Sequence, residues 1–429
     1  MTGDPPVFLN GDGKIMKQVL LCSFYFVPRN CIASYRTGCF AKYLVENGWM
    51  PTVICQDWPV GSPNYDPDFV GKLPDGVTVI RVPNPVIRGF YARVVERKLF
   101  PYFQPERAPI HWWRRALGEI MSLLKKQSFD AVWGTSDPLA PLGLAQVAAR
   151  RLGVGWVADI RDSYNAQHFS SWYKRPGLAY REGTLCRAAS HVTTVSDGLA
   201  EAIQGRCHRS VEVINNGFDP ALFENQPVVQ REQIFRVVFS GTLAWPRQDP
   251  TPFFQALDLC LRRGAIPAGE IEVCFYGADL REYLRARPGI CEHLPVRILA
   301  RIPHSSMIRI LQATPVLLVL SHVTERGVLP AKIFDYLGAG RAILSVPDDH
   351  GEVKALLDRT GAGVAATHPE EIAAQLTAWF RDWKAGNELL HTRKEHEVAR
   401  YSRREQTRRL AGILYEVSSR PRVVPSPSR

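Results

Sequence analysis

The residues best suited to chemistry lie in one short stretch, GVLPAKIFDYLGAGRAIL, which spans residues 327–344 and follows the apolar run PVLLVLS. The run is typical of a buried strand, and Pro330 suits the first position of the helix that follows. Lys332 then lies near the N-terminal end of this helix, where free backbone N–H groups favour an anion. Asp335 shares its helix face. We expect Lys332 to bind a diphosphate and Asp335 to accept hydrogen bonds from sugar hydroxyl groups; a surface Lys–Asp pair is the alternative.

A second candidate stretch is VVFSGTLAWPRQDP, residues 237–250. Gly241 lets backbone N–H groups approach an anion without a Cβ in the way. Arg247 follows closely enough to clamp a diphosphate. The predicted binding site further includes residues at the ends of later apolar runs and in the loop before the helix: Gly277, Ile302, Glu325, Val328 and Leu329.

The N-terminal half supplies other charged candidates. The first apolar run ends in FVPRNCIASYRTG, which lacks the G-x-G-x-x-G spacing of a dinucleotide site and so argues against a dehydrogenase. We expect Arg29 and Arg36 to meet an anion at the next helix N-terminus, with ordinary surface arginines as the alternative. VADIRDSY ends another run in Asp159, Arg161 and Asp162, for which ligand contact and an internal Arg–Asp pair both stay open.

These candidates are positioned by strands that alternate with amphipathic helices along most of the chain. One series runs from KQVLLCSFYF to VEVINNG, and a second opens with FRVVFSG after the polar segment ENQPVVQREQ. Such alternation predicts parallel sheets covered by helices on both faces. The sequence therefore predicts two doubly wound α/β domains that meet near residue 225. Ligands are expected at the carboxyl ends of the strands, in a cleft between the domains.

The predicted organisation has four parts: a disordered arm at 1–15, a first domain at 16–225, a second domain at 232–400, and a basic helix and tail at 401–429. The stretch MKQVLLCSFYFV resembles a signal peptide but lacks a small-residue cleavage site, so we interpret it as a buried strand. Met16 is an alternative start to Met1. The basic C-terminal helices are interpreted as a solvated face, with membrane or nucleic-acid contact as the alternative.

Composition bounds the class of protein. With 429 residues, 45% hydrophobic and 22% charged, the chain is typical of a soluble globular protein, and no apolar run is long enough for a transmembrane helix. Nine cysteines without a C-x-x-C pair indicate reduced thiols in the cytosol rather than disulfides or a zinc site. The net charge of +11 favours an anionic partner: a nucleotide, a nucleic acid or an acidic membrane surface.

Taken in order over residues 17–415, these segments resemble family 4 of the retaining glycosyltransferases, which have the GT-B fold. The resemblance rests on FYFVPRNCIASYRTGCFAKYLVENGWMPTVI, VADIRDSY, HVTTVSDGLAEAI, VINNGFDPALF, VVFSGTL and GVLPAKIFDYLGAGRAIL. The last of these is similar to a branch that reads "g.l..KlfEYL..g.PiL". No single motif is decisive, but six in order across both halves are fairly specific.

The resemblance implies two Rossmann-like domains facing across a cleft, and transfer of a sugar with retention of anomeric configuration. The donor would be a UDP- or GDP-linked sugar in the C-terminal domain, and no metal or cofactor would be needed. The acceptor would be a saccharide or lipid-linked precursor in cell-surface polysaccharide or glycoconjugate biosynthesis. Carried over position by position, the donor site comprises Gly241, Thr242, Arg247, Lys332 and Asp335, with Asp162 near the donor sugar. The acceptor side comprises Arg29, Arg36 and Arg161.

The sequence departs from the family pattern at three places. Asp335 replaces the usual glutamate, and Gly327 stands where a first acid is expected, with Glu325 two residues earlier. Thr242 occupies the position of the usual first basic residue after the strand, and Arg247 only roughly serves for the second. These departures leave the donor preference open. They also motivate an alternative, a non-catalytic binding protein on a GT-B fold.

Two segments, residues 88–115 and 168–181, interleave basic and aromatic side chains. Such surfaces suit a membrane interface, so we expect a cytoplasmic protein attached peripherally to the inner membrane face. A core helix followed by a solvated loop is the alternative. Among other classes, a nucleotide-sugar epimerase would share the fold without needing an acceptor, and a phosphorylase would need a pyridoxal-phosphate lysine for which no motif is present. A nucleic-acid binder is motivated by charge alone, and we expect no nucleic-acid partner.

Overall fold

A computed structural model describes residues 15–62, 64–67, 69–84, 109–136, 138–162, 175–224, 233–322 and 329–419. The chain divides into two compact units: unit 1 is Met1–Asn215 with Arg403–Arg429, and unit 2 is Asn216–Ser402. The division falls earlier than residue 225 because the segment after Asn216 joins unit 2. There the backbone N–H of Phe218 donates to the carbonyl oxygen of Tyr401 at 3.1 Å. The predicted arm lies outside the described residues except for Ile15.

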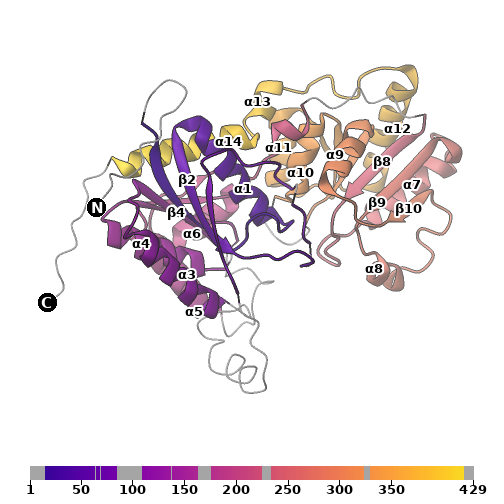
Figure 1. Cartoon of the computed structure of the whole chain (residues 1–429). Coiled ribbons are helices and arrows are strands. Elements are labelled where there is room, and N and C mark those ends of the chain that lie inside the picture. Colours follow the sequence, from indigo (N-terminus) through magenta and orange to yellow (C-terminus); the bar gives the residue numbers. More distant parts are fainter. Residues whose placement is uncertain are drawn as a thin grey trace. The chain divides into compact units, whose positions relative to one another are not determined.

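Unit 1 is built on a parallel sheet whose seven described strands follow the order β3-β2-β1-β4-β5-β6-β7 (Figure 1). Every residue of β4 and β5 is buried, which explains why these strands appear in the sequence as continuous apolar runs. The chain order reverses between β1 and β4, the usual place for a ligand in such a sheet. The bounds are β1 Lys17–Cys22, β2 Trp49–Gln56, β3 Thr78–Val82, β4 Ala131–Thr135, β5 Trp156–Ile160, β6 His191–Thr194 and β7 Glu212–Val213.

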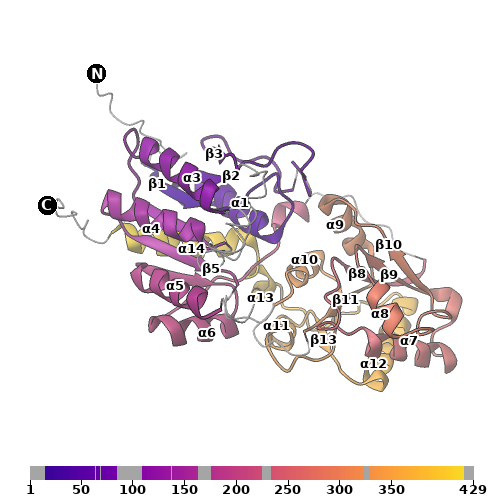
Figure 2. The ribbon, with the colours of Figure 1, turned by 90° about the horizontal axis from the view of Figure 1, so that it is seen from below.

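Helices cover both faces of this sheet (Figures 1 and 2). On one face, Val132 of β4 shares an apolar cluster with α3, α4, α5 and α6. Trp133 points to the opposite face, where its ring lies 5.6 Å from that of Phe40 on α1. The C-terminal helix α14 packs beside α1 on that face. The helix bounds are α1 Ile32–Leu44, α3 Pro109–Leu123, α4 Ala140–Leu152, α5 Arg175–Ala188, α6 Asp197–Cys207 and α14 Arg403–Ser418.

Unit 2 is a second parallel sheet, with six described strands in the order β10-β9-β8-β11-β12-β13. One apolar cluster lies under α7, α8 and α12, and another under α9, α10, α11 and α13, so this sheet too is covered on both faces (Figure 2). The strand bounds are β8 Phe235–Ser240, β9 Ile271–Tyr276, β10 Val296–Leu299, β11 Val316–Leu320, β12 Ala342–Val346 and β13 Gly363–Ala365. The helix bounds are α7 Thr251–Arg262, α8 Arg281–Ala286, α9 His304–Ala313, α10 Lys332–Ala339, α11 Glu352–Thr360, α12 Pro369–Ala385 and α13 Glu395–Ala399.

The prediction that Pro330 opens the helix after β11 is wrong. Helix α10 begins at Lys332, and Ala331 is its N-cap. The carbonyl oxygen of Pro330 instead accepts the backbone N–H of Ile333 at 3.0 Å, a tight bond three residues along the chain. Lys332 is thereby the first residue of α10 and lies in its first turn.

The structure bears on the predictions made for the cysteines, for membrane-spanning helices and for the basic and aromatic segments. The nine cysteines are free, as expected. Among the described residues, no helix combines the length and apolar character needed to cross a bilayer. Of the basic and aromatic segments, residues 85–108 and 163–174 lie outside the described residues. Within α3, however, Trp112 is completely buried in the core of unit 1, which corresponds to the alternative of a core helix.

Candidate functional site

The loop after β8 is held rigidly at the carboxyl edge of the second sheet. Gly241 has a φ of +101°, a conformation that a side chain would strain, and its N–H donates to the carbonyl oxygen of Tyr276 at 2.8 Å. Further along, the Gln248 side chain accepts the N–H of Ala244 at 3.0 Å and donates to the carbonyl oxygen of Leu320 at 2.6 Å. Gly241 and Thr242 are exposed on this fixed loop, so their backbone is accessible to a ligand.

Lys332 carries a buried amine with no hydrogen-bond partner among the described residues. Its Nζ lies 3.5 Å from the ring centroid of Phe239 on β8, and a Cβ at Gly241 would be 3.7 Å from the same atom. Burial lowers the pKa of Lys332 from 10.5 to about 7. The geometry therefore places an amine, without a counter-ion among the described residues, beside the exposed loop and at the end of α10 that favours anions.

Asp335 pairs with a residue that sequence reasoning did not select. Its Oδ2 lies 2.9 Å from Nε2 of His304, the first residue of α9. Among the described contacts, the Lys332–Asp335 pair that was the alternative to ligand binding is not present. His304 follows β10 at the carboxyl edge of the sheet, so the rule that ligands bind at strand ends contains a signal for it.

A tyrosine ties α10 to the end of β8. The hydroxyl oxygen of Tyr336 accepts the backbone N–H of Ser240 at 2.9 Å and lies 3.2 Å from the Ser240 hydroxyl. Tyr336 is completely buried, and burial raises the pKa of its hydroxyl well above the usual range. This contact sets how closely Lys332 approaches Gly241, although the sequence search did not single it out.

The other donor-side candidates fall on the same edge where the structure describes them. Gly277 follows β9 with a φ of +70°, and a Cβ there would lie 3.4 Å from the Arg301 side chain. Arg247 is half-buried in the loop after β8. Ile302 and Leu329 pack against the apolar cluster beneath α10. Glu325, Val328 and Gly327 lie outside the described residues.

In unit 1, Arg36 makes an internal ion pair. Its side chain is completely buried, and its Nη2 and Nε lie 2.8 and 3.1 Å from the two carboxylate oxygens of Asp159. Its Nη1 donates to the carbonyl oxygen of Asn215 at 3.0 Å. Asp159 also accepts from the hydroxyls of Thr135 and Thr193. The internal Arg–Asp pair is thus present, but its arginine comes from α1 and not from the β5 loop.

Arg161, Asp162 and Arg29 complete the predicted set. Arg161 is nearly buried, and its Nε donates to the Thr135 hydroxyl at 2.9 Å, so it too supports the end of β5. Asp162 follows β5 and is half-buried. The Arg29 guanidinium lies 4.1 Å from the ring centroid of Trp58, in a stacking arrangement. Arg36 and Arg161 are thus joined in one hydrogen-bonded network through Asp159 and Thr135, whereas Arg29 lies over Trp58.

A cavity of about 360 Å³ lies at the carboxyl edge of the first sheet. Asp57 and Trp58, directly after β2, and Arg81 on β3 line it. Arg81 donates to the carbonyl oxygen of Val27 at 2.7 Å. An aromatic ring beside a carboxylate and a guanidinium suits a polar ring-shaped ligand.

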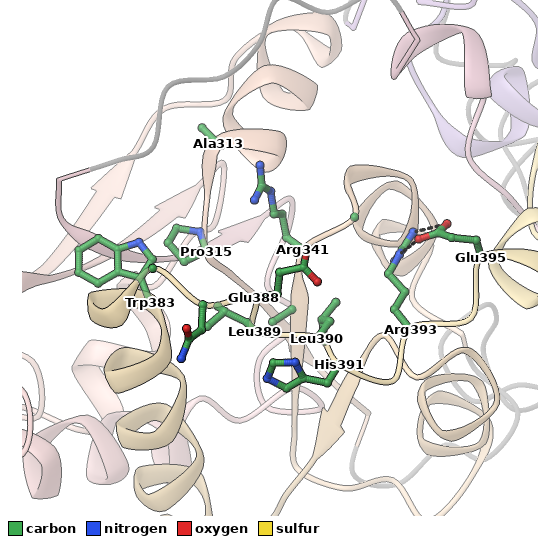
Figure 3. A pocket seen from close by; sticks show the side chains of 14 residues that line it. Ala313, Pro315, Arg341, Trp383, Glu388, Leu389, Leu390, His391, Arg393 and Glu395 are labelled. Carbon is green, nitrogen blue, oxygen red and sulfur yellow. Dashed lines mark hydrogen bonds and ion pairs between the residues drawn. The ribbon is translucent and has the colours of Figure 1, made fainter.

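A second cavity, about 750 Å³, lies at the opposite edge of the second sheet (Figure 3). Pro315 and Arg341, which directly precede β11 and β12, line it together with Trp383 and His391. The labelled Arg393 in this view pairs with Glu395 at 2.6 Å. This cavity therefore lies at the amino ends of the strands, away from Lys332. Within the described residues, His, Cys, Asp and Glu side chains form no group of three that would hold a metal ion.

Two parallel sheets, each covered by helices on both faces, define the GT-B fold, and solved structures of this fold match nearly the whole chain. HepE from Anabaena, in complex with UDP and glucose, is 15% identical with a TM-score of 0.61, covering 93% of this chain and 99% of that one. A glycosyltransferase from Rickettsia africae is 13% identical with a TM-score of 0.64, covering 95% and 100%. Sucrose-phosphate synthase from Thermosynechococcus elongatus is 14% identical with a TM-score of 0.62, covering 93% and 98%.

The family match is confined to unit 1. Residues 33–217 match the family model described as a glycosyl transferase 4-like domain, from α1 to just beyond β7. No curated protein matches the chain. The fold class predicted from the sequence is thus confirmed. For the predicted family, the comparisons show a glycosyl transferase 4-like domain at residues 33–217, and the predicted branch stays a prediction.

Proposed function

We propose that the protein is a glycosyltransferase that binds a UDP- or GDP-linked sugar at the carboxyl edge of the unit 2 sheet and transfers the sugar to a saccharide or lipid-linked acceptor. The buried amine of Lys332 carries the proposal, because it lies beside exposed Gly241 without a partner among the described residues. A diphosphate at this place supplies the missing counter-charge and favours the protonated amine. The glycosyl transferase 4-like domain and the GT-B relatives, one of them in complex with UDP and glucose, support the same assignment.

The chemistry requires stabilisation of a leaving group more than it requires a nucleophile. As the bond between sugar and diphosphate breaks, negative charge grows on the phosphate oxygens. Lys332, the positive end of the α10 dipole and Arg247 are the groups proposed to bind that charge. They are fixed before reaction, since Tyr336 anchors α10 and Gln248 anchors the loop.

On the acceptor side, we propose that the cavity beside Trp58 receives a sugar ring, with Asp57 and Arg81 binding its hydroxyls. We do not include Arg36 and Arg161 in the proposed acceptor site, because both make internal contacts. Retention of anomeric configuration, independence of metal and a role in cell-surface polysaccharide or glycoconjugate biosynthesis are proposed from the ordered sequence motifs. Peripheral membrane attachment is proposed on the same basis and is tested by co-sedimentation with anionic vesicles at low salt.

Calorimetric titration with UDP, GDP, UDP-glucose and GDP-mannose tests the donor site. We expect Lys332→Met to weaken diphosphate binding about tenfold or more, because a charge-assisted contact is lost. Lys354→Met is the matched control, since the Lys354 amine is exposed and pairs with Asp358 at 2.8 Å. Wild-type protein that binds none of these nucleotides would contradict the proposal.

Product analysis separates the proposed reaction from its alternatives. Incubation with donor alone yields an altered nucleotide sugar if the protein is an epimerase, and only the original donor or slow hydrolysis if it is a transferase. Addition of an acceptor yields a glycoside whose anomeric configuration is read by NMR. An inverted product would contradict retention while leaving transfer intact.

A further inference from the structure

We propose that His304 is a positioning residue: its imidazole fixes the Asp335 carboxylate so that Oδ2 is held by the protein and Oδ1 is presented to the hydroxyl groups of a bound nucleotide sugar. This inference rests on the proposed function and adds to it a residue that the sequence did not indicate. It concerns how the site is assembled and not which sugar is transferred.

The geometry of the pair supports this role. His304 Nε2 and Asp335 Oδ2 are 2.9 Å apart, and the two side chains are 16% and 21% exposed. Oδ1 of Asp335 makes no hydrogen bond with another described residue. A carboxylate held through one oxygen keeps the acceptor capacity of the other. The pair thus leaves one oxygen accessible in a partly shielded environment.

Its place in the fold points to a ligand rather than to stability. His304 is the first residue of α9, after β10, and Asp335 lies in the first turn of α10, after β11. Both are at the carboxyl edge of the sheet, where ligands of such folds bind. Beneath them the two helices already pack through the fully or almost fully buried side chains Ile308, Leu311, Ile333 and Leu337. The packing holds the helices together, so the pair mainly orients the carboxylate.

The pair also keeps the two charged residues of α10, Lys332 and Asp335, apart from each other. The Lys332 amine is turned toward the ring of Phe239 and toward Gly241. Because His304 binds Asp335, the carboxylate does not draw this amine away from the loop. The amine is then available to phosphate and the carboxylate to hydroxyl groups. A nucleotide sugar carries both kinds of group.

The test compares UDP-glucose binding by the full chain and its variants, with GDP-mannose as a second probe. We expect His304→Ala to weaken binding about tenfold, as for loss of a hydrogen bond to a charged group. His304→Gln retains an N–H donor near the Nε2 position and should restore most of the affinity. Because His304 acts through Asp335, the double variant His304→Ala/Asp335→Ala should bind no worse than Asp335→Ala alone.

The matched control is His293→Ala. His293 pairs with Asp258 at the same 2.9 Å, but it is 62% exposed and belongs to neither α9 nor α10. This change should leave affinity unaltered, and melting temperatures should show that all variants fold. Unchanged binding by His304→Ala, or failure of His304→Gln to restore affinity, would overturn the role of His304 alone. Absence of binding by the wild type would overturn the proposed function and this inference together.

Discussion

At the scale of single residues, the buried cation of unit 1 has a counter-ion, whereas that of unit 2 has none among the described residues. Arg36 is completely buried and meets both carboxylate oxygens of Asp159, so its charge is compensated inside the protein. The buried amine of Lys332 lies over the face of Phe239 and has no hydrogen-bond partner among the described residues. An uncompensated buried charge is costly, so its persistence at a ligand-binding edge indicates a functional role.

The pH dependence of stability gives a direct prediction for Lys332. Between about 7, its lowered pKa, and the ordinary 10.5, the unfolded chain holds a proton that the folded chain has released. Unfolding free energy therefore rises with pH across this window and is lowest below pH 7. Lys332→Met removes the cost of protonating the buried amine in the folded chain. It should therefore raise the free energy of unfolding at pH 6 by about 2 kcal/mol or more, since each pH unit of the window is worth about 1.4 kcal/mol.

Thermal melts at pH 6 and pH 9.5 measure this effect. The stabilisation by Lys332→Met should be clear at pH 6 and much smaller at pH 9.5, where most of the cost has gone. Lys354→Met serves as control, because its amine is exposed. Equal stabilisation at both pH values would show that the amine is not forced toward neutrality in the folded chain.

At the scale of elements, the strands and helices were largely predictable because each has its own periodic signal. The run FRVVFSG predicts β8 almost residue for residue, and GEVKALLDRTG predicts α11. The predicted start of α10 at Pro330 is too early. Proline suits the first helical position, but this preference does not show which backbone carbonyl accepts the first hydrogen bond of the helix. His304 was missed because its partner Asp335 lies 31 residues away, and a single sequence does not reveal that pairing.

Packing of α10 against the segment after β7 yields an element-scale prediction. A Cβ at Gly338, inside α10, would lie 2.6 Å from the ring of Phe223 and 2.9 Å from that of Phe218. Gly338→Ala forces these rings to move, which should destabilise unit 2 by about 1–3 kcal/mol despite the better helix propensity of alanine. Urea denaturation provides the measurement.

Gly412→Ala is the matched control for this change. Gly412 lies within α14, and no atom is within 4 Å of the place where its Cβ would be. Here only helix propensity acts, so we expect a gain of about 0.5–1 kcal/mol. If Gly338→Ala stabilised the protein as Gly412→Ala does, the close contact with the two phenylalanines would be refuted.

At the scale of the whole molecule, two α/β units were predictable from length and from the restart of the strand–helix pattern. The return of the chain to unit 1 at Arg403 was not. The basic composition of the last helix indicated a solvated face, but one side of α14 is buried, with Arg403, Leu410, Leu414 and Val417 among its buried residues. Periodicity shows that a helix has an apolar side without showing which sheet that side covers.

Unit 1 should therefore depend on the last helix, although the family match ends at residue 217. The Tyr415 ring packs against Trp49 in a tilted arrangement with centroids 5.0 Å apart, and Lys17 Nζ donates to Ser418 Oγ at 2.7 Å. Removing α14 uncovers part of β4 and β5 and the side of α1 that packs against it. Large apolar surface exposed in this way promotes aggregation.

Two shortened chains test this dependence. A chain ending at Ser402 should aggregate or melt at a much lower temperature, because the apolar face that α14 covers becomes exposed to water. A chain ending at Ser419 keeps the helix and should melt with the full-length protein. Size-exclusion chromatography and thermal melts distinguish the two. If the chain ending at Ser402 stayed monomeric with an unchanged melting temperature, unit 1 would be complete without α14, and the returning helix would be dispensable for its fold.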